Sequence, residues 1–196
     1  MKIRGRIIIL CAAILSSTSV FAASFKGILG VGAEFGGDRL LSVTYSDGSS
    51  SDILAGQGFT LFGGVAAKDL LALGPIAIDL QGTVGVKYST IQEATNADAS
   101  FFRFPLEILV LARWEGLRVG LGPAYHFANS FSGSGALAGY NFGLDNALGL
   151  TVQLDYLFLK HWGIGARYTS ISYQPELVGA SSVSGSNFGG EVSYFF

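Results

Sequence analysis

Charged side chains are the groups in this sequence with the clearest potential for chemistry. Twelve of them occupy one face of eight stretches whose other face is apolar. Seven are basic and five are acidic: Lys26, Glu34, Lys68, Asp79, Lys87, Arg103, Glu107, Arg113, Arg118, Asp155, Arg167 and Glu191. An uncompensated buried charge costs several kcal/mol, so a near balance of signs favours mutual ion pairs if this face is enclosed.

A second group of residues raises the question of catalysis. His126 is followed four residues later by Ser130, and a hydrolytic dyad needs such a pair within hydrogen-bond reach. A spacing of four at the end of a strand does not impose that contact, so we expect no catalytic residue. The other histidine, His161, is 35 positions away, and Cys11 is the single cysteine. The sequence therefore predicts neither a metal site nor a bound cofactor.

The elements that carry these residues alternate between apolar and polar positions. The clearest one places Ile76, Ile78, Leu80, Val84, Val86 and Tyr88 on one face, and Asp79, Gln81, Thr83 and Lys87 on the other. Eight stretches follow this two-residue period, which is typical of β-strands. Their apolar faces contain no charged residue, whereas the opposite faces hold all twelve.

Composition excludes the commoner alternatives. Hydrophobic residues make up 49% of the chain and charged ones 13%, with 28 glycines and a mean hydropathy of +0.46, which disfavours a soluble domain. The longest uninterrupted apolar run, Ile7 to Leu15, is much shorter than the ~20 residues of a spanning helix. A closed barrel also satisfies every backbone group in lipid. We therefore predict an all-β fold, an eight-stranded antiparallel up-and-down transmembrane β-barrel.

The first 22 residues have the organisation of a secretory signal peptide. Lys2, Arg4 and Arg6 precede the short apolar run, and small residues follow it up to Ala22. We expect cleavage after Ala22, which leaves residues 23–196 as one barrel domain. Removal of three of the 12 basic residues leaves 9 against 14 acidic ones, a net charge of −5. Nucleic acid is not expected as a partner of such a chain.

The connections alternate in length, as in barrels with short periplasmic turns and long extracellular loops. The short turns are predicted at 69–74, 115–116 and 160–161, and the long loops at 36–57, 89–100, 128–145 and 174–187. Aromatic residues then form two interfacial girdles. The lower girdle comprises Phe25, Trp114, Phe158, Trp162 and Phe196; the upper one comprises Phe35, Phe59, Tyr88, Phe102, Phe127 and Tyr173.

Eight inward charges are candidates for ion pairs that close the lumen. Asp79, Asp155, Arg167 and Glu191 fall at similar heights above the lower rim, and Glu34, Lys87, Arg103 and Glu107 form a higher group. An eight-stranded barrel is just wide enough for side chains to fill it, which favours a salt-bridged plug. A gated path for ions or solutes is the alternative. In loop 36–57 the alternation continues to Asp47-Gly48, so this segment is either a protruding ribbon or a polar loop.

Two segments resemble a known family. The C-terminal Val192, Tyr194 and Phe196 alternate and end in phenylalanine, which resembles the C-terminal signature of Gram-negative outer-membrane barrels. The stretch Phe101 to Ile108 and the later Gly120-Leu121-Gly122-Pro123-Ala124-Tyr125 are similar to the pattern of the outer-membrane β-barrel domain family. In overall plan the mature chain resembles the OmpA-transmembrane and OmpX type.

The resemblance implies a place in the Gram-negative outer membrane, with membrane lipids and lipopolysaccharide as neighbours. It also implies recognition of Val192, Tyr194 and Phe196 by the barrel-assembly machinery. We expect a monomeric, non-enzymatic surface scaffold that serves adhesion, surface protection or envelope integrity through its extracellular loops, where an extracellular ligand would bind. The alternatives are a small gated pore and an enzyme that modifies lipid A of the outer leaflet.

Overall fold

The structure is a computed structural model that describes residues 23–44, 48, 50–94, 97–135, 137–139, 141–176 and 179–196. The predicted signal peptide, residues 1–22 with its cleavage site after Ala22, lies outside the described residues. All regular secondary structure in the described part is β-strand. None of the described residues belongs to a helix long and apolar enough to cross a membrane.

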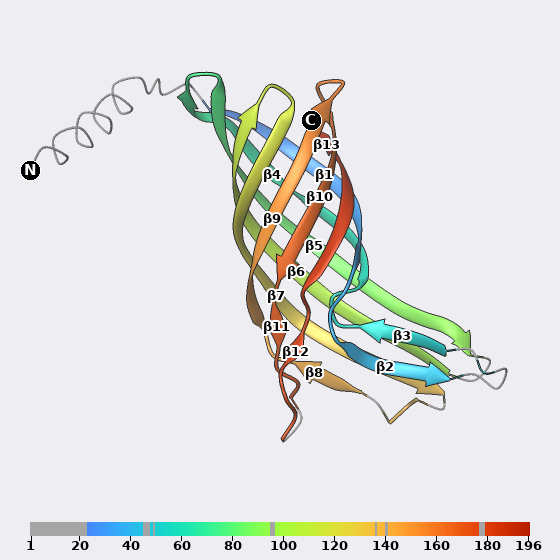
Figure 1. Cartoon of the computed structure of the whole chain (residues 1–196). Coiled ribbons are helices and arrows are strands. Elements are labelled where there is room, and N and C mark those ends of the chain that lie inside the picture. Colours follow the sequence, from blue (N-terminus) through green and yellow to red (C-terminus); the bar gives the residue numbers. More distant parts are fainter. Residues whose placement is uncertain are drawn as a thin grey trace, which may run out of the picture.

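Eight strands form a closed antiparallel barrel, which confirms the predicted fold (Figure 1). They are β1 (Ser24–Phe35), β4 (Gly58–Leu73), β5 (Ile76–Ala94), β6 (Ala97–Trp114), β7 (Leu117–Gly135), β9 (Ala147–Phe158), β10 (Trp162–Ser170) and β13 (Asn187–Phe195). The first and last strands pair with each other, with Val31 opposite Val192. The pairing of β6 with β7 completes the ring, so the wall of the barrel is hydrogen-bonded all the way round.

The two-residue period of the sequence separates the lipid-facing side chains from those in the lumen. Leu121 is 58% exposed on the outer wall, whereas its neighbours on the strand point inward. Inside, glycines make room for larger residues. A Cβ on Gly30 would lie 2.3 Å from the Phe62 ring, so this inward ring depends on the glycine opposite it.

The periplasmic turns are tighter than predicted in one case. The predicted turn at 69–74 is wrong, because β4 continues to Leu73 and the chain reverses at Gly74 and Pro75. Asp69, the first residue of the predicted turn, belongs to a bulge instead. Asp69 has a φ of 59°, and the pairing of β4 with β5 changes register between Ala67 and Leu71.

Two of the predicted long loops are largely strand, which corrects the prediction for 89–100 and 128–145. β5 runs to Ala94, β6 begins at Ala97 and β7 runs to Gly135, so three neighbouring strands continue well above the upper girdle. The outer face of these extensions carries small polar residues such as Thr90, Ser100 and Ser132, because it no longer meets lipid. A short strand, β8 (Phe142–Leu144), extends this sheet beyond β7.

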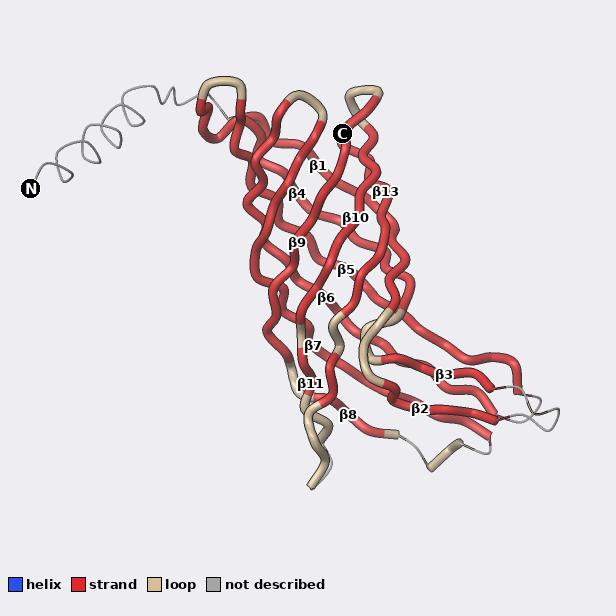
Figure 2. The backbone as a smooth tube through the Cα atoms, in the orientation of Figure 1, coloured by secondary structure: helices blue, strands red, loops and turns tan. Residues whose placement is uncertain are grey.

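Segment 36–57 forms a ribbon, as one of the two interpretations of its alternation predicted. β2 (Arg39–Thr44) pairs with β3 (Ser50–Leu54), and Arg39 forms an exposed ion pair with Asp52 across it. β11 (Ser172–Tyr173) and β12 (Val183–Ser184) make a second small hairpin. Figure 2 shows the ribbon projecting from the end of the barrel that lies opposite the short turns.

Candidate functional site

A cluster of buried charges occupies the middle of the lumen. Arg167 on β10 donates hydrogen bonds to Glu107 and Glu191 and lies 3.7 Å from the Glu34 carboxylate. Lys87 donates to the other oxygen of Glu34. All five side chains are almost completely buried. The lumen at this level is therefore filled by an ion-pair network that draws on five strands.

Two further ion pairs lie towards the periplasmic end. Arg118 and Asp155 are opposite each other on β7 and β9, and the guanidinium makes two parallel hydrogen bonds of 2.6 and 2.9 Å to the carboxylate. Nearer the rim, Asp79 accepts a 2.9 Å hydrogen bond from Arg113, which also bridges to Asp69. Bidentate arginine–carboxylate geometry of this kind gives strong and directional pairing.

The structure therefore groups the predicted ion-pair residues differently from the prediction, which grouped them by their height above the lower rim. Arg167 joins the upper residues Glu34 and Glu107, and it brings Glu191 with it. Asp79 and Asp155 belong to separate pairs with arginines of their own. A cavity of about 10 Å³ lies within the upper cluster, which is about the space that one water molecule needs.

Arg103 does not join a carboxylate in the described structure. It lies on β6 opposite a bulge in β7, where Ala128 has a φ of 50°, and it is completely buried. Its guanidinium donates to the backbone carbonyls of Ala55 and Gln57 and stacks on the Phe101 ring at 4.2 Å. Arg103 thus holds the segment that returns from the ribbon to the barrel over the outer end of the lumen.

The two residues of the hypothetical dyad point in different directions. His126 is buried in the lumen, where its Nδ1 lies 2.5 Å from the Tyr173 hydroxyl. Ser130 is exposed on the outer face of β7, because the bulge at Ala128 reverses the alternation between the two residues. The arrangement does not support proton transfer from this serine to this histidine.

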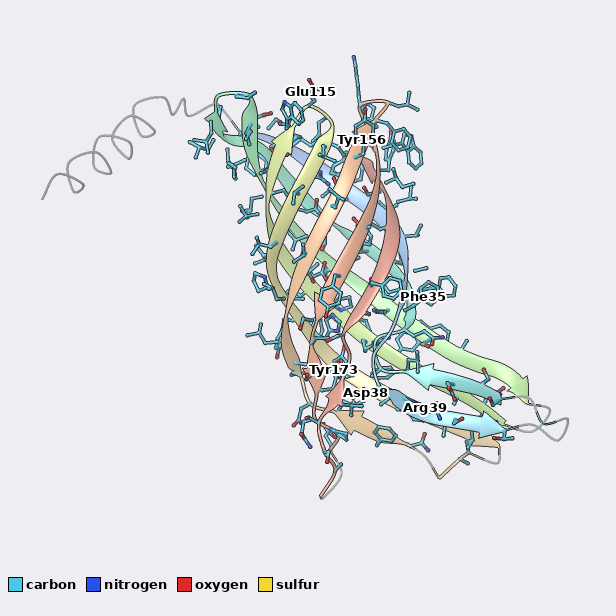
Figure 3. All side chains as sticks on the ribbon, in the orientation of Figure 1. Phe35, Asp38, Arg39, Glu115, Tyr156 and Tyr173 are labelled. Carbon is cyan, nitrogen blue, oxygen red and sulfur yellow. The ribbon has the colours of Figure 1, made fainter. Side chains whose placement is uncertain are left out.

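Tyr173 was predicted in the upper girdle, and that assignment is wrong. It is buried, and it lies at the extracellular end of the barrel (Figure 3). Its ring packs edge to face against that of Phe101. The sequence contains a signal for this inward position that the prediction missed. The outward residues of β10 are even-numbered, so the odd-numbered Tyr173 faces inward if the alternation continues beyond the strand.

Above the lumen, the extracellular segments share a hydrophobic core. Ile53 of the ribbon, Phe101 of β6, Phe131 of β7 and Tyr173 of β11 all belong to one buried cluster. Asp38, at the base of the ribbon, accepts a 2.7 Å hydrogen bond from the Ser184 amide of β12. We call this assembly of the ribbon, the upper parts of β5 to β7, β8 and the β11–β12 hairpin the extracellular cap.

The residues of the predicted assembly signal lie on the outer wall. Val192, Tyr194 and Phe196 all face outward, and the ring of Tyr194 lies 5.0 Å from that of Trp162 at the lower interface. The backbone of Phe196 exchanges two hydrogen bonds of 3.0 Å with Gly27. The last residue of the chain is therefore part of the seam between the terminal strands.

The family model of the outer membrane protein beta-barrel domain matches residues 8–196. The chain belongs to this family. As a member of the outer membrane protein beta-barrel domain family, it is an integral protein of the Gram-negative outer membrane. Its outer wall accordingly contacts lipid, and the cap lies at the end of the barrel opposite the short turns.

Several solved structures are similar to this member of the family in outline. Ail, the attachment invasion locus protein of Yersinia pestis, is 13% identical, with a TM-score of 0.49 over 90% of this chain and 100% of that chain. Neisserial surface protein A is also 13% identical, with a TM-score of 0.45 over the same shares. AlkL is 14% identical, with a TM-score of 0.39 over 91% and 93%. Among curated proteins no match was found.

Proposed function

We propose that this barrel is a non-enzymatic surface scaffold that serves adhesion, surface protection or envelope integrity through its extracellular cap. The observation that carries the proposal is the hydrophobic core of the cap, which includes Ile53, Phe101 and Phe131. Segments with a shared core hold a fixed shape, and a fixed shape lowers the entropic cost of binding a partner. The barrel below serves as the anchor of this platform.

The lumen supports a closed anchor more than a pore. Arg167 and its carboxylates fill the middle, and Arg103 holds the Ala55–Gln57 backbone above them. A conducting path would require these ion pairs to separate, which leaves buried charges without partners. We therefore expect little steady conductance from the native protein.

The ribbon offers the most accessible binding element of the cap. Among the described strands, β2 pairs with β3 alone, so its other edge presents backbone donors and acceptors to the outside. Such an edge can accept an extended segment of a partner protein. The Arg39–Asp52 pair on the ribbon adds charges of both signs beside this edge.

The test shortens residues 40–54 to an Asn-Gly turn. Arg39 is already opposite Leu54, and the Ala55 amide donates to the Asp38 carbonyl at 2.8 Å, so a tight turn can join these ends without moving the barrel. Residues Ala55 and Gln57, which Arg103 holds, are retained. Heat modifiability on gels should show that the shortened barrel still folds.

Cells that produce the wild type, the shortened protein or a His126→Ala control are then compared with cells that lack the protein. Adherence to immobilised extracellular matrix and survival in detergent are measured. We expect the shortened protein to lose the wild-type phenotype and His126→Ala to retain it. The proposal would be contradicted if the shortened protein kept the wild-type phenotype. It would also be contradicted if the wild type changed the mass of lipid A and only His126→Ala abolished that change, a result that would favour an enzyme.

A further inference from the structure

A polar groove lies on the outer face of the cap, immediately above the upper girdle. Its floor is formed by side chains that pair across three strands: Thr90 on β5, Ser100 on β6 and Ser132 on β7 are aligned in one row. Asp98 and Ser134 form the next row further out, where the serine hydroxyl lies 3.4 Å from the carboxylate. The groove has a volume of about 520 Å³, within the range of ligand sites.

The Tyr88 ring lines the groove on the membrane side, and the Phe102 ring lies beside it. Tyr88 and Phe102 are paired on β5 and β6, and their ring centroids are 4.9 Å apart. Both belong to the girdle, so the groove is continuous with the lipid-facing wall. The opposite face of the same sheet packs against the ribbon through Ala99, Phe101 and Phe131. The groove and the ribbon are thus on different faces of the cap.

The chemistry of the groove selects among the groups present at this level of the membrane. The Thr90 hydroxyl donates to the Ala99 carbonyl, but an acyl chain would leave the Ser100 and Ser132 hydroxyls without partners. Phosphate would meet the Asp98 carboxylate, and none of the described residues that line the groove is a lysine or an arginine. Hydroxyl groups act both as donors and as acceptors, and a carboxylate accepts strongly from a hydroxyl. A ring with several hydroxyls and an apolar face fits this lining.

We propose that this groove binds the saccharide headgroup of an outer-leaflet glycolipid. The sugar hydroxyls bond to Asp98, Ser100 and Ser132, and the apolar face of a sugar ring packs on Tyr88 and Phe102. The occupant comes from the same membrane, because the groove begins where the girdle ends and opens sideways towards neighbouring headgroups. The interaction is separate from any partner of the ribbon.

The experiment uses the refolded barrel in lipid discs and two soluble or vesicular probes. One is the core oligosaccharide released from lipopolysaccharide, titrated while backbone amide shifts are followed by NMR. The other probe is lipopolysaccharide in vesicles. The unfolding of the protein is compared between vesicles that contain core-bearing lipopolysaccharide and vesicles that contain lipid A alone. We expect the oligosaccharide to shift the amides of Ser100 and Ser132, and core-bearing vesicles to protect the protein more than lipid A does.

Asp98→Asn and the Ser100→Val/Ser132→Val double variant test the groove, with Ser42→Val on the ribbon as a matched control. The groove variants should bind the oligosaccharide roughly tenfold to a hundredfold more weakly, because Asp98→Asn loses a charge-assisted hydrogen bond and the serine variant loses two neutral ones. Ser42→Val should bind as the wild type does, because Ser42 is exposed on the ribbon and away from the groove.

Three outcomes would overturn the inference. They are the absence of shifts in the groove at millimolar oligosaccharide, equal protection by lipid A alone, and loss of binding in Ser42→Val but not in Asp98→Asn. The proposed function is tested by the adherence and survival of the shortened protein, so the two proposals can fail independently.

Discussion

Arg167→Met tests the ion-pair network at its central residue. The change removes the only partner that Glu191 has among the described residues. Glu107 and Glu34 each lose one partner as well, but Glu107 keeps its hydrogen bond from Thr151 and Glu34 keeps its ion pair with Lys87. Removing one partner of a buried pair typically costs about 3–5 kcal/mol, and we expect a loss in this range. Urea unfolding of the refolded protein in vesicles measures it, with the fluorescence of Trp114 and Trp162 as the signal.

Arg39→Met is the matched control, since the Arg39 side chain is 62% exposed in its pair with Asp52. An exposed pair contributes about 0–1 kcal/mol. Adding Glu191→Gln to Arg167→Met removes the carboxylate that lost its partner and should restore part of the stability. The reasoning is refuted if the two arginine variants are equally stable, or if Glu191→Gln deepens the loss.

Three further predictions concern other parts of the barrel. Leu121→Arg on the lipid-facing wall should lower the free energy of unfolding in urea by about 2–4 kcal/mol. Ser132→Arg, above the girdle, should lower it by less than about 1 kcal/mol. Equal losses would show that the membrane lies elsewhere. Arg103→Ala frees the segment above the lumen and should raise planar-bilayer conductance over the wild type; unchanged currents would mean that the ion pairs alone close the lumen. Phe196→Ala should lower the amount of folded barrel in cells while the refolded protein keeps near-native stability, and normal amounts in cells would argue against an assembly signal at this residue.

Alternation explains why the barrel and the orientation of its charges could be predicted from the sequence. A strand has a period of two, so an apolar outer face forces every other residue into the lumen. All eight predicted ion-pair residues are buried there, including Asp79 and Asp155 near the lower rim. This inference needs only local sequence, because lipid on one side and a narrow interior on the other constrain every strand alike.

Bulges and the extracellular strands were harder to predict, for a common reason. A bulge inserts one residue and reverses the alternation, as Ala128 does before Ser130, and no residue type marks it reliably. The extracellular end of β6 consists of alanine, aspartate and serine, and that of β7 is rich in serine and glycine, so both have little intrinsic strand propensity. They continue as strands because each pairs with a neighbour that also continues, with Ser100 opposite Ser132.

Strand tilt determines which inward charges meet. The row of paired residues that starts at Arg167 passes through Gln153 and Gly120 and reaches Leu111 on β6. Arg167 nevertheless binds Glu107, which lies four residues before Leu111, towards the extracellular end of β6. Three strand spacings of about 4.8 Å make about 14 Å, and a tilt of about 40° turns this into a displacement of about 12 Å, or roughly 3.6 residues of 3.3 Å. Heights counted along single strands ignore this displacement. Because tilt belongs to the closed barrel and not to any one strand, local sequence predicts which charges enter the lumen but not which of them form pairs.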